Sequence, residues 1–527
     1  MSTRDTKPIT INDGPPARYQ LQMKRVNLDK ESDEESKLRK FTLGTRGPRY
    51  VNRTILLVGE TGSGKSTLVN ALVNFVMGVK FKDKVWFEVI SDEKDRPQFE
   101  SQTSAVSVYE IFGFEGKTVP YSLTIIDTPG YGDTEGLDKD EMIIQLLQSL
   151  FCIPQGVDTV SAVGLVMKAS VNRLDDRVAY VFNSVTSLFG KDMKKNIVVM
   201  MTHSDGREPT NALKALEAAD IKVAKNSKNE PVYFLFNNCQ KEKIGNEKQA
   251  AKFAFDTSDD GMKKITDFLG KAKPQSLKTT MEVMKERIRL TACVQNLNER
   301  VTEVEMKQEV IRKNREELAR CEEEMEKNKD FVINTEESYK EKEEIKAKWL
   351  GDKRAVTCNN CKENCHYPGC TWAWSPSWCY VMKDEKCTSC SGKCPVDAHV
   401  KENWIYVTKK KRVEKTIGEM EAKYKENKTK SEEKTSLLED LEKELSDLEQ
   451  YKKQCLDEAF IIIEELEKIS LNVNSVSTFL HLEFLIEKMG TGDTEKIQKL
   501  EELRSRMNKA NQAAASYIQK LEKSPVM

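Results

Sequence analysis

One short stretch constrains this chain more than any other, because it matches the phosphate-loop pattern G-x-x-x-x-G-K-[ST] at every position. The stretch reads Gly59-Glu60-Thr61-Gly62-Ser63-Gly64-Lys65-Ser66-Thr67. The apolar run Thr54–Val58 before it predicts a buried strand, and Leu68 and Leu72 after it begin a helical spacing. Strand, glycine loop and helix together are the arrangement that a phosphate-binding loop requires.

The chemistry of such a loop follows from its backbone. Glycines let backbone amides curl around a β-phosphate, and the helix N-terminus adds partial positive charge. We expect Lys65 to reach the β- and γ-phosphates as a catalytic residue, and the Ser66 hydroxyl to bind Mg²⁺. The alternative is a glycine-rich turn that binds nothing, which the complete motif and its context disfavour.

Residues 51–272 alternate short apolar runs with helical stretches. This alternation predicts an α/β P-loop NTPase domain, a mostly parallel sheet with helices on both faces. Ligands of such sheets bind at the carboxyl ends of the strands. The candidate strands are Ile55–Val58, Val106–Phe112, Leu123–Ile126, Ala162–Met167, Ile197–Met201 and Val232–Phe236.

The sequence Asp127-Thr128-Pro129-Gly130 directly follows one of these strands. A carboxylate at this strand end can hold the Mg²⁺ shell, and a glycine lets its amide approach the γ-phosphate. Alone, such a sequence is also an ordinary turn. After a complete phosphate loop, it predicts that Asp127 and Gly130 bind nucleotide and metal.

A second motif, Thr202-His203-Ser204-Asp205, follows the strand Ile197–Met201. An aspartate here can accept both the ring N–H and the exocyclic amine of guanine, whereas adenine presents no such donor pair. We therefore expect Asp205, with Thr202 and His203 beside it, to select guanine. The alternative is that Ser204 or Asp205 caps a helix.

Two weaker signals complete the predicted site. Asn237 and Asn238 follow the strand Val232–Phe236, where a side-chain amide can contact the guanine carbonyl, although such pairs are also common in plain turns. Thr103 lies between the phosphate loop and Asp127, where a mobile threonine closes on Mg²⁺ when the γ-phosphate is present. Ser104 is the alternative, and a solvated loop is the simplest interpretation of both.

These motifs together resemble those of the septin-like branch of GTPases, above all the immunity-associated GTPases (GIMAP family), and more distantly septins and chloroplast-envelope import GTPases. The resemblance covers residues 51–270 and includes the segment Val171–Asp176 followed by Leu188-Phe189-Gly190. It implies GTP binding and nucleotide-dependent homodimerisation through the G-domain face. His203 replaces the usual lysine of small GTPases, as in the relatives. Tyr131 stands where Ras-like enzymes carry a glutamine, so the water-orienting residue is unidentified and hydrolysis is less secure than binding.

The bulk composition sets the cellular context that we expect. The chain has 527 residues and a net charge of −1, so no global field draws it to nucleic acid. No apolar run approaches the ~20 residues that span a bilayer, and the first residues lack a signal-peptide core. We expect a cytoplasmic protein with reduced thiols, in which residues 1–50 are an irregular lead-in with one strand near Tyr19–Leu21.

Beyond the predicted G domain, the sequence changes character. In residues 276–350 apolar residues recur every seven positions from Val283 to Tyr339, and residues 403–470 show a 3–4 spacing. Each arm is roughly 70–75 residues, or about 110 Å of helix. Equal arms around a compact insert predict an antiparallel coiled-coil hairpin in which Ile311 faces Asp440. The alternatives are pairing with another molecule or a single exposed helix.

The insert, residues 351–402, holds eight of the 13 cysteines. Two C-x-x-C pairs, Cys358/Cys361 and Cys387/Cys390, have the spacing of zinc knuckles, so we expect a small tip built on structural zinc. Disulfides and an iron–sulfur cluster are the alternatives. The spacing leaves the division of the ligands open, with enough of them for two tetrahedral sites. The zinc candidates are Cys358, Cys361, Cys365, His366, Cys370, Cys379, Cys387, Cys390, Cys394 and His399.

Residues 471–527 predict two helices that fold back near the stalk base or the G domain, or else a partner-binding tail. The whole pattern favours a GTPase switch whose nucleotide-dependent dimerisation is coupled to a stalk, with a protein partner at the stalk or zinc tip. A GTP-bound interaction scaffold with negligible turnover is the alternative. A zinc-hook ATPase is less consistent, because residues 470–527 lack an acidic Walker-B pair and Asp205 favours guanine.

Overall fold

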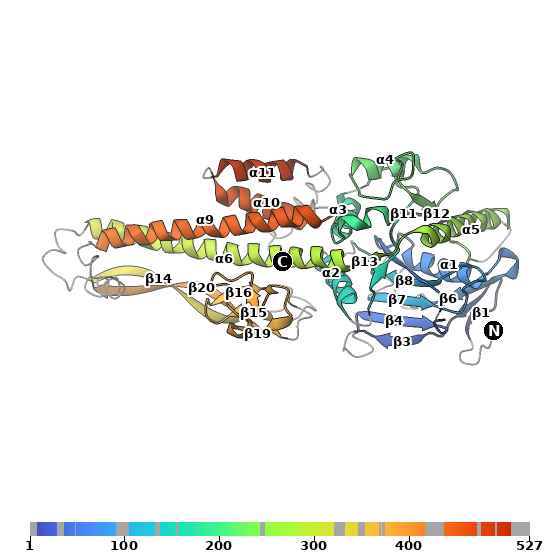
Figure 1. Cartoon of the computed structure of the whole chain (residues 1–527), viewed down its shortest axis with the longest axis horizontal. Helices are drawn as coiled ribbons and strands as arrows, with labels where there is room; N and C mark the ends of the chain where they lie inside the picture. Colours follow the sequence, from blue (N-terminus) through green and yellow to red (C-terminus); the bar gives the residue numbers. More distant parts are fainter. Residues whose placement is uncertain are drawn as a thin grey trace. The chain divides into compact units, whose positions relative to one another are not determined.

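The computed structural model describes residues 8–28, 36–47, 49–90, 105–131, 137–153, 156–174, 176–242, 248–320, 332–345, 354–367, 370, 375–416, 437–471, 476–490 and 493–506. It divides into two compact units (Figure 1). The first unit is Met1–Met284 with Glu467–Leu480 and Glu502–Met527, and the second is Lys285–Leu466 with His481–Glu501.

An eight-stranded sheet forms the centre of the first unit. In spatial order its strands are β12 (Tyr233–Leu235), β11 (Ile197–Thr202), β10 (Ala162–Lys168), β5 (Asn52–Gly59), β8 (Ser122–Asp127), β7 (Val106–Ile111), β4 (Leu38–Leu43) and β3 (Lys24–Asn27). Among these strands, β8–β7 and β4–β3 pair antiparallel and the other neighbours pair parallel. The mostly parallel sheet and its six predicted strands are confirmed.

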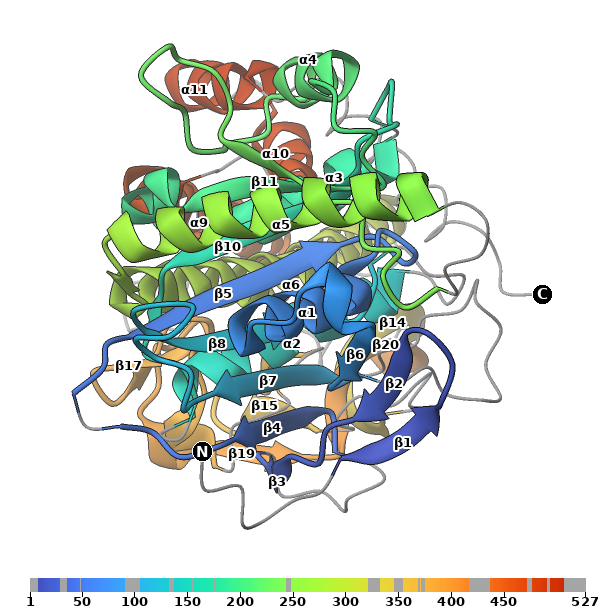
Figure 2. The ribbon, with the colours of Figure 1, turned by 90° about the vertical axis from the view of Figure 1, so that its right-hand side faces the viewer.

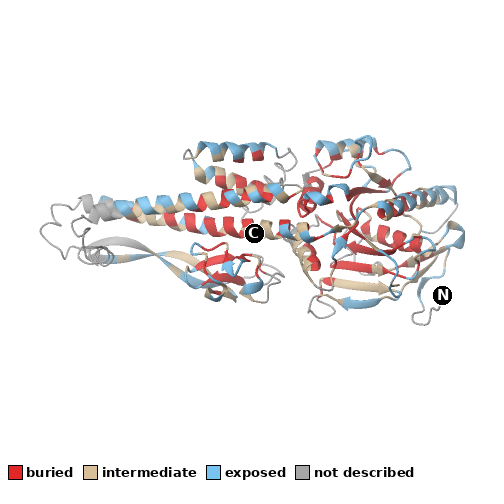
Figure 3. Cartoon of the chain, in the orientation of Figure 1, coloured by how far each residue is buried: buried red, intermediate tan, exposed pale blue. Residues whose placement is uncertain are grey.

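Helices cover both faces of this sheet (Figure 2). The helices are α1 (Lys65–Met77), α2 (Leu137–Cys152), α3 (Asp176–Thr186), α4 (Thr210–Ala218) and α5 (Lys248–Lys271). Along β5, Leu56 and Val58 pack with residues of α2 and α3, while Ile55 and Leu57 pack with α1 and α5. This alternation buries both faces of the strand, and Figure 3 shows the centre of the sheet buried while its edge strands are partly exposed. It explains why the sequence of β5 is a continuous apolar run.

The strand predicted near Tyr19–Leu21 is present as β2 (Ala17–Gln20), but the described part of residues 1–50 holds three further strands and is less irregular than expected. Strands β1 (Ile9–Asn12) and β2 form a small sheet with β6 (Val85–Glu88), and β3 and β4 extend the central sheet. Strand β4 pairs with β7, and the Phe41 and Tyr109 rings stack at 5.3 Å. The sequence signal was weak because polar residues dominate these strands. In addition, β2 and β4 pair with strands that lie much later in the chain, as in the pairs Ala17 with Val85 and Leu38 with Val106.

The short elements of the first unit join the G domain to the long helix α6 (Lys278–Arg320). Strand β9 (Thr159–Val160) pairs with β13 (Gln275–Ser276), which lies directly before α6. The end of α5 and the start of α6 therefore lie close to the predicted boundary near residue 272. The 3-10 turns of the chain are η1 (Phe81–Asp83), η2 (Lys191–Lys195), η3 (Pro376–Trp378) and η4 (Val396–Ala398).

In the second unit, α6 runs beside the helix α9 (Leu437–Ile469). Arg300 Nη1 donates to the Tyr451 hydroxyl at 2.9 Å, and Lys452 Nζ lies 3.1 Å from Glu305. These contacts show that the two helices lie side by side, and their antiparallel coiled-coil register stays a prediction. The helices α10 (Val476–Met489) and α11 (Thr494–Ser505) follow, and Lys496 of α11 bonds Asp457 of α9 at 2.7 Å. In its described part, the end of the chain therefore folds back on the stalk helix, which is one of the two predicted alternatives.

The prediction of two continuous helical arms is wrong in the stretches next to the insert. Residues Val332–Glu344 and Trp404–Thr416 form strands β14 and β20, which pair antiparallel along their whole length. The run Trp404–Thr408 is rich in aromatic and β-branched residues, which favour strands. The flanks of the insert pair with each other as predicted, but their secondary structure is a ribbon.

The ribbon also changes where the cysteine-rich insert lies. Lys340 of β14 bonds Glu303 at 2.9 Å, and Lys410 of β20 bonds Glu309 at 3.0 Å, so the ribbon runs along α6. The insert then contacts α6 near Asn296, whose amide donates to Glu363 and to the Asn364 carbonyl. The insert is therefore packed on the side of the helix pair, and the expectation of a tip at the far end of a straight stalk is corrected.

The insert is a small β module. Its strands are β15 (Ala355–Cys358), β16 (Glu363–His366), β17 (Met382–Lys383), β18 (Lys386–Cys387) and β19 (His399–Glu402). Strand β15 lies between β16 and β19, while β17 and β18 form a separate hairpin.

Among the described residues, no helix is both long enough and apolar enough to cross a membrane.

Candidate nucleotide site and metal-binding module

The predicted nucleotide motifs meet at one edge of the central sheet. Strands β8, β5, β10, β11 and β12 run parallel, so their carboxyl ends lie on the same side. The phosphate loop follows β5, Asp127 ends β8, Thr202 ends β11, and Asn237 and Asn238 follow β12. This is the edge at which parallel α/β sheets bind ligands.

The glycines of the phosphate loop are required by its shape. Gly62 and Gly64 have φ of 75° and 90°, in the left-handed region that favours glycine. A Cβ at Gly59 would lie 2.3 Å from the Val166 carbonyl oxygen, so no side chain fits there. The loop then leads into α1, which begins at Lys65 and continues through Ser66 and Thr67.

Lys65 is buried at the base of the loop, with 6% of its surface exposed. Its ammonium donates to the carbonyl oxygens of Gly59 at 2.8 Å and Glu60 at 2.9 Å. Burial lowers the pKa of Lys65 to about 8, while the nearby Asp127 and Glu60 carboxylates act in the opposite direction. A phosphate would supply the anionic partner that a buried ammonium otherwise lacks.

Other groups at the loop fit a phosphate and its Mg²⁺. The Thr61 and Ser63 hydroxyls are buried without a hydrogen-bond partner among the described residues. Asp127 is fully buried at the end of β8, and Ser66 stands in the first turn of α1. Hydroxyl and carboxylate oxygens are the donors that Mg²⁺ prefers. Ser66 and Asp127 are therefore the described residues that would hold the metal.

The Asp127–Gly130 segment is bonded directly to the phosphate loop. The Thr61 amide donates to the Tyr131 carbonyl at 3.1 Å, and the Tyr131 amide donates to the Gly59 carbonyl at 3.2 Å. A Cβ at Gly130 would lie 2.6 Å from Thr61 Cα. The Tyr131 side chain is fully buried in the core beside α2.

Asp205 lies on the exposed side of the base-recognition segment, with 71% of its side chain accessible. One carboxylate oxygen accepts from the Arg207 amide at 3.0 Å. His203 has a φ of 52°, and burial lowers its pKa, as does the charge of Lys168. The alternative of a helix cap is wrong, because α4 begins only at Thr210 and has no side-chain cap.

Two asparagines flank this segment as predicted. Asn237 Nδ2 donates to the Ser204 carbonyl at 3.0 Å and so ties β12 to the base-recognition loop. The Asn238 oxygen accepts from Ser258 Oγ at 2.9 Å, while its Nδ2 is buried without a hydrogen-bond partner among the described residues. That amide is a donor suited to the guanine carbonyl. Ser258 lies in α5, and no motif in the sequence pointed to it.

The predicted magnesium ligand Thr103 and its alternative Ser104 lie outside the described residues.

All ten zinc candidates lie in three clusters within the β module. One cluster is Cys358, Cys361, Cys390 and Cys394; the second is Cys365, Cys387, Cys390 and His399; the third is His366, Cys370 and Cys379. In each cluster the ligand atoms lie within 4.8 Å of one another. The described cysteines are free thiols rather than disulfides. Such groups of thiols and imidazoles are the donor sets that zinc takes.

Comparison with known proteins finds similarity in the segment that carries the candidate nucleotide site. A family model described as the AIG1 family matches residues 53–255. Translocase of chloroplast 34 from Pisum sativum is 29% identical over 156 residues, which cover 30% of this chain and 42% of that protein. Septin-1 from Drosophila melanogaster is 35% identical over 80 residues, 15% of this chain and 19% of that protein. The chain thus spans less than half the length of these relatives.

A third relative, GTP-binding protein A from Dictyostelium discoideum, is 26% identical over 198 residues, covering 37% of each protein. Among solved structures, Toc33 from Arabidopsis thaliana in complex with Mg²⁺ and GMPPNP is 19% identical. It covers 42% of this chain and 87% of that chain, with a TM-score of 0.28. Because this structural similarity is low, the fold of residues 53–255 rests on their own strand order and on the family match.

Proposed function

We propose that this chain, whose residues 53–255 form an AIG1-family G domain, is a guanine-nucleotide switch coupled to the helix pair α6 and α9. One observation carries the proposal: the phosphate loop, Asp127 and the base-recognition segment all lie at the carboxyl edge of one parallel sheet. Lys65 would bind the β- and γ-phosphates of GTP, and Ser66 and Asp127 would hold Mg²⁺, with Thr103 closing the metal shell.

The base-recognition segment supports guanine over adenine. Asp205 presents an accessible carboxylate that can accept two donors, and guanine offers two on its Watson–Crick edge. Asn238 presents a buried amide donor for the guanine carbonyl, and Thr202 and His203 line the same loop. Adenine has an exocyclic donor where guanine has a carbonyl, so it would leave this amide without an acceptor.

A physical path runs from this site to the long helices within the first unit. The segment after β8 contacts the phosphate loop at Thr61 and leads into α2. At the other end of α2, Cys152 Sγ lies 4.0 Å from Met281 Sδ in the first turns of α6. Met284 is buried in the same core. A nucleotide that moves the Gly130 segment would therefore move α2 against the root of α6.

A second attachment lies at the end of α9. The Lys191 ammonium donates to the carbonyl oxygens of Glu467 at 3.1 Å and Lys468 at 2.9 Å, which end that helix. The Leu471 amide donates to the Phe189 carbonyl at 3.0 Å. Both helices of the pair are thus joined to the G domain at different places, so a change in its shape would act on them unequally.

We further propose that GTP drives homodimerisation through the G domains. For the chloroplast translocon components atToc33 and psToc159, dimerisation is described as important for the GTPase activity. The second candidate is a GTP-bound scaffold with negligible turnover, which fits the presence of Tyr131 where Ras-like GTPases carry a glutamine. In the switch candidate, the facing protomer of the dimer would supply the water-orienting residue, which is unidentified among the described residues of one chain.

The cysteine-rich module would bind zinc as a structural element of the helix pair and would offer a docking point for a protein partner. Thiols kept reduced in the cytoplasm, where we place the chain, suit zinc rather than disulfides. None of the three clusters includes a glutamate or aspartate ligand, and cysteine-rich sites of this kind are typically structural.

The test of guanine selection is the substitution Asp205→Asn. An amide there presents a donor to a position that donates in guanine but accepts in xanthine, so GTP affinity should fall by at least tenfold and xanthosine triphosphate affinity should rise. Calorimetry with GTP, ATP and xanthosine triphosphate in the presence of Mg²⁺ measures both. Asp220→Asn, a surface aspartate in the same unit, is the matched control and should leave all three affinities unchanged. Unaltered GTP binding by the Asp205→Asn chain would refute the assignment.

A further inference from the structure

The ten sulfur and nitrogen ligands of the cysteine-rich module do not divide into the two separate tetrahedral sites that their number suggests. They form two four-ligand clusters and one three-ligand cluster, and the Cys390 thiol belongs to both four-ligand clusters. The seven ligands of the paired clusters therefore serve two sites, and His366, Cys370 and Cys379 remain as a third set.

The distances within the clusters fit metal coordination. Four thiolates at about 2.3 Å from a zinc ion in tetrahedral geometry stand about 3.8 Å apart. In the first cluster, Cys361 Sγ lies 3.6 Å from Cys394 Sγ. In the third, Cys370 Sγ lies 3.8 Å from Cys379 Sγ, and His366 Nδ1 lies 3.1 Å from Cys379 Sγ. A disulfide needs about 2.05 Å between sulfurs, so these contacts are not disulfides.

Backbone and side-chain bonds prepare these ligands for a cation. The amides of Cys361, Ser389, Cys390 and Cys394 each point at a ligand sulfur at 3.4 Å. Such donors stabilise the thiolate form that a metal requires. His399 Nδ1 lies 2.9 Å from the Pro395 carbonyl oxygen, which leaves Nε2, 3.8 Å from Cys390 Sγ, free to bind metal.

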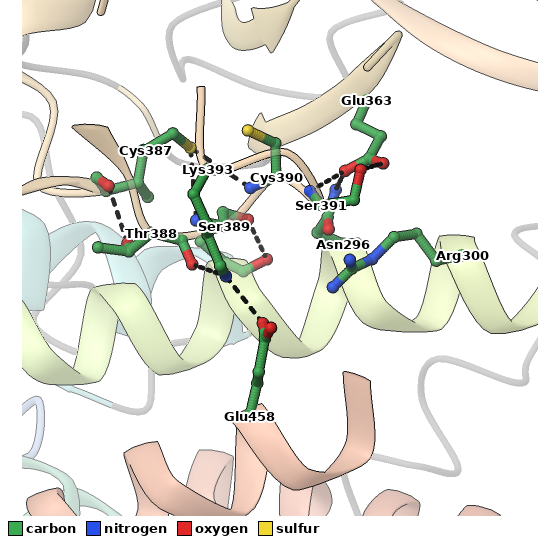
Figure 4. A network of polar contacts seen from close by, with 12 residues as sticks. Asn296, Arg300, Glu363, Cys387, Thr388, Ser389, Cys390, Ser391, Lys393 and Glu458 are labelled. Atoms are coloured by element: carbon green, nitrogen blue, oxygen red, sulfur yellow. Dashed lines mark hydrogen bonds and ion pairs between the residues drawn. The ribbon is translucent and has the colours of Figure 1, made fainter. Parts of the chain in front are cut away.

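The surroundings also favour a negatively charged pair of sites. Six thiolates against two divalent ions leave a net negative charge, and two cationic side chains lie beside the module. The Arg300 guanidinium is buried, and its Nε and Nη2 have no hydrogen-bond partner among the described residues. Lys393 stands between Cys390 and Cys394 in the sequence and bonds Glu458 of α9 at 2.8 Å (Figure 4).

From this arrangement we propose that the module binds three zinc ions: two that share the Cys390 thiolate, and a third on His366, Cys370 and Cys379. The proposal rests on the zinc-binding role of the module given above and adds the number and division of the ions. It does not depend on nucleotide binding.

The shared ions would fix the module on the helix pair. The loop from Cys387 to Cys394 carries Ser389, whose hydroxyl donates to the Ala292 carbonyl at 3.3 Å, and Ser391, whose amide donates to Glu363 at 3.0 Å (Figure 4). Glu363 also accepts from Asn296 of α6 at 3.2 Å. The loop that supplies three ligands of the shared pair therefore contacts α6 directly and α9 through Lys393.

The first test is the zinc content of the purified full-length chain, measured by mass spectrometry of the metal. We expect three zinc ions per chain and two in the Cys370→Ser variant. The Cys390→Ser variant loses one ligand from each paired site, so a chelator should remove two of its ions, rather than one, more readily than from the unchanged chain. Cys239→Ser, in the first unit, is the matched control and should retain three. Two ions in the unchanged chain, or no loss in Cys370→Ser, would overturn the three-ion division while leaving zinc binding itself intact.

A second measurement covers the case in which the Cys390→Ser chain does not fold. Co²⁺ replaces zinc in the unchanged chain, and electron paramagnetic resonance then reports magnetic coupling between ions. Two ions that share a thiolate should couple and lose most of their signal, leaving about one uncoupled ion per chain. Three independent signals would refute the shared ligand. If the chain as isolated contains iron and shows a visible absorbance band, the assignment of zinc to the module is wrong. This outcome would not affect the test of GTP binding.

Discussion

At the scale of single residues, Lys65 places a buried positive charge in the nucleotide-free phosphate loop. The ammonium is buried and donates to the loop carbonyls of Gly59 and Glu60. Its folded-state pKa is about 8, below the ordinary 10.5, because burial disfavours the charged form. The unfolded chain therefore binds more protons between these values, and Lys65 destabilises the fold most at low pH and least above about pH 10.

Replacing Lys65 by methionine should therefore stabilise the nucleotide-free chain at neutral pH while removing GTP binding. We expect a gain of about 1–3 kcal/mol at about pH 7, which shrinks as the pH rises through 8 toward 10. Denaturant unfolding across this pH range measures the difference, and zinc content should not change. A gain that grows with pH would contradict the burial of a charged Lys65.

A single glycine sets the geometry of one metal cluster. A Cβ at Gly392 would lie 3.0 Å from Cys394 Sγ and 3.1 Å from Cys361 Sγ. The chain passes close to these two ligands, so a side chain here would require the sulfurs to shift by a few tenths of an ångström. Sequence spacing pointed to the cysteines on either side, but it gave no reason to single out this residue.

At the scale of elements, the segment between β8 and α2 is the part placed to respond to the γ-phosphate. Its backbone bonds to the phosphate loop through Thr61 and Tyr131, and the close approach of Gly130 to Thr61 makes these bonds possible. Because α2 begins shortly after this segment and reaches Met281 at its end, the position of Gly130 is linked to the root of α6.

Gly130→Ala tests this element. A Cβ there would lie 2.6 Å from Thr61 Cα and 2.7 Å from Thr61 N, so the segment must move away from the loop. We expect the nucleotide-free chain to lose about 1–3 kcal/mol of stability. The ratio of GTP to GDP affinity should fall at least tenfold, because the Gly130 amide serves the γ-phosphate, while GDP affinity changes little. Calorimetry with both nucleotides measures the ratio, and an unchanged ratio would refute the role of Gly130.

The ribbon of β14 and β20 shows where element type could not be taken from periodicity. A seven-residue spacing that runs through Val332 and Tyr339 continued the pattern of α6. Both residues lie in β14, where the partner strand decides the structure through a register that joins Val332 to Thr416 and Tyr339 to Lys409. A basic stretch at residues 409–412 opposite an acidic strand favours this pairing.

At the scale of the whole molecule, the switch and scaffold candidates differ in how hydrolysis depends on protein concentration. If facing G domains complete the catalytic site, the single-turnover rate of GTP hydrolysis per chain should rise at least tenfold as the chain passes from monomer to dimer. The Asp205→Asn chain, assayed with GTP, gives the background rate of hydrolysis. A rate that stays at background while light scattering shows dimers would favour the scaffold.

How much the sequence predicted follows from how local each feature is. The phosphate loop, the Asp127–Gly130 turn and the Thr202–Asp205 segment are each set by a few consecutive residues, so their types and spacing alone identified the candidate nucleotide site. Contacts made by residues that are far away in the sequence were not predictable. Ser258 reaches Asn238 from α5, and β4 joins the sheet through a strand much later in the chain.

By itself the sequence determined which chemistry this protein carries: a phosphate loop, an aspartate for a purine base, and ten ligands in one insert. These are fixed by residue identity over short spans. The tertiary structure alone decided that the flanks of the insert pair as a β ribbon along α6, and that Cys390 stands in two ligand clusters. Both depend on which distant backbones meet, and the free energy of those contacts is a property of the folded chain.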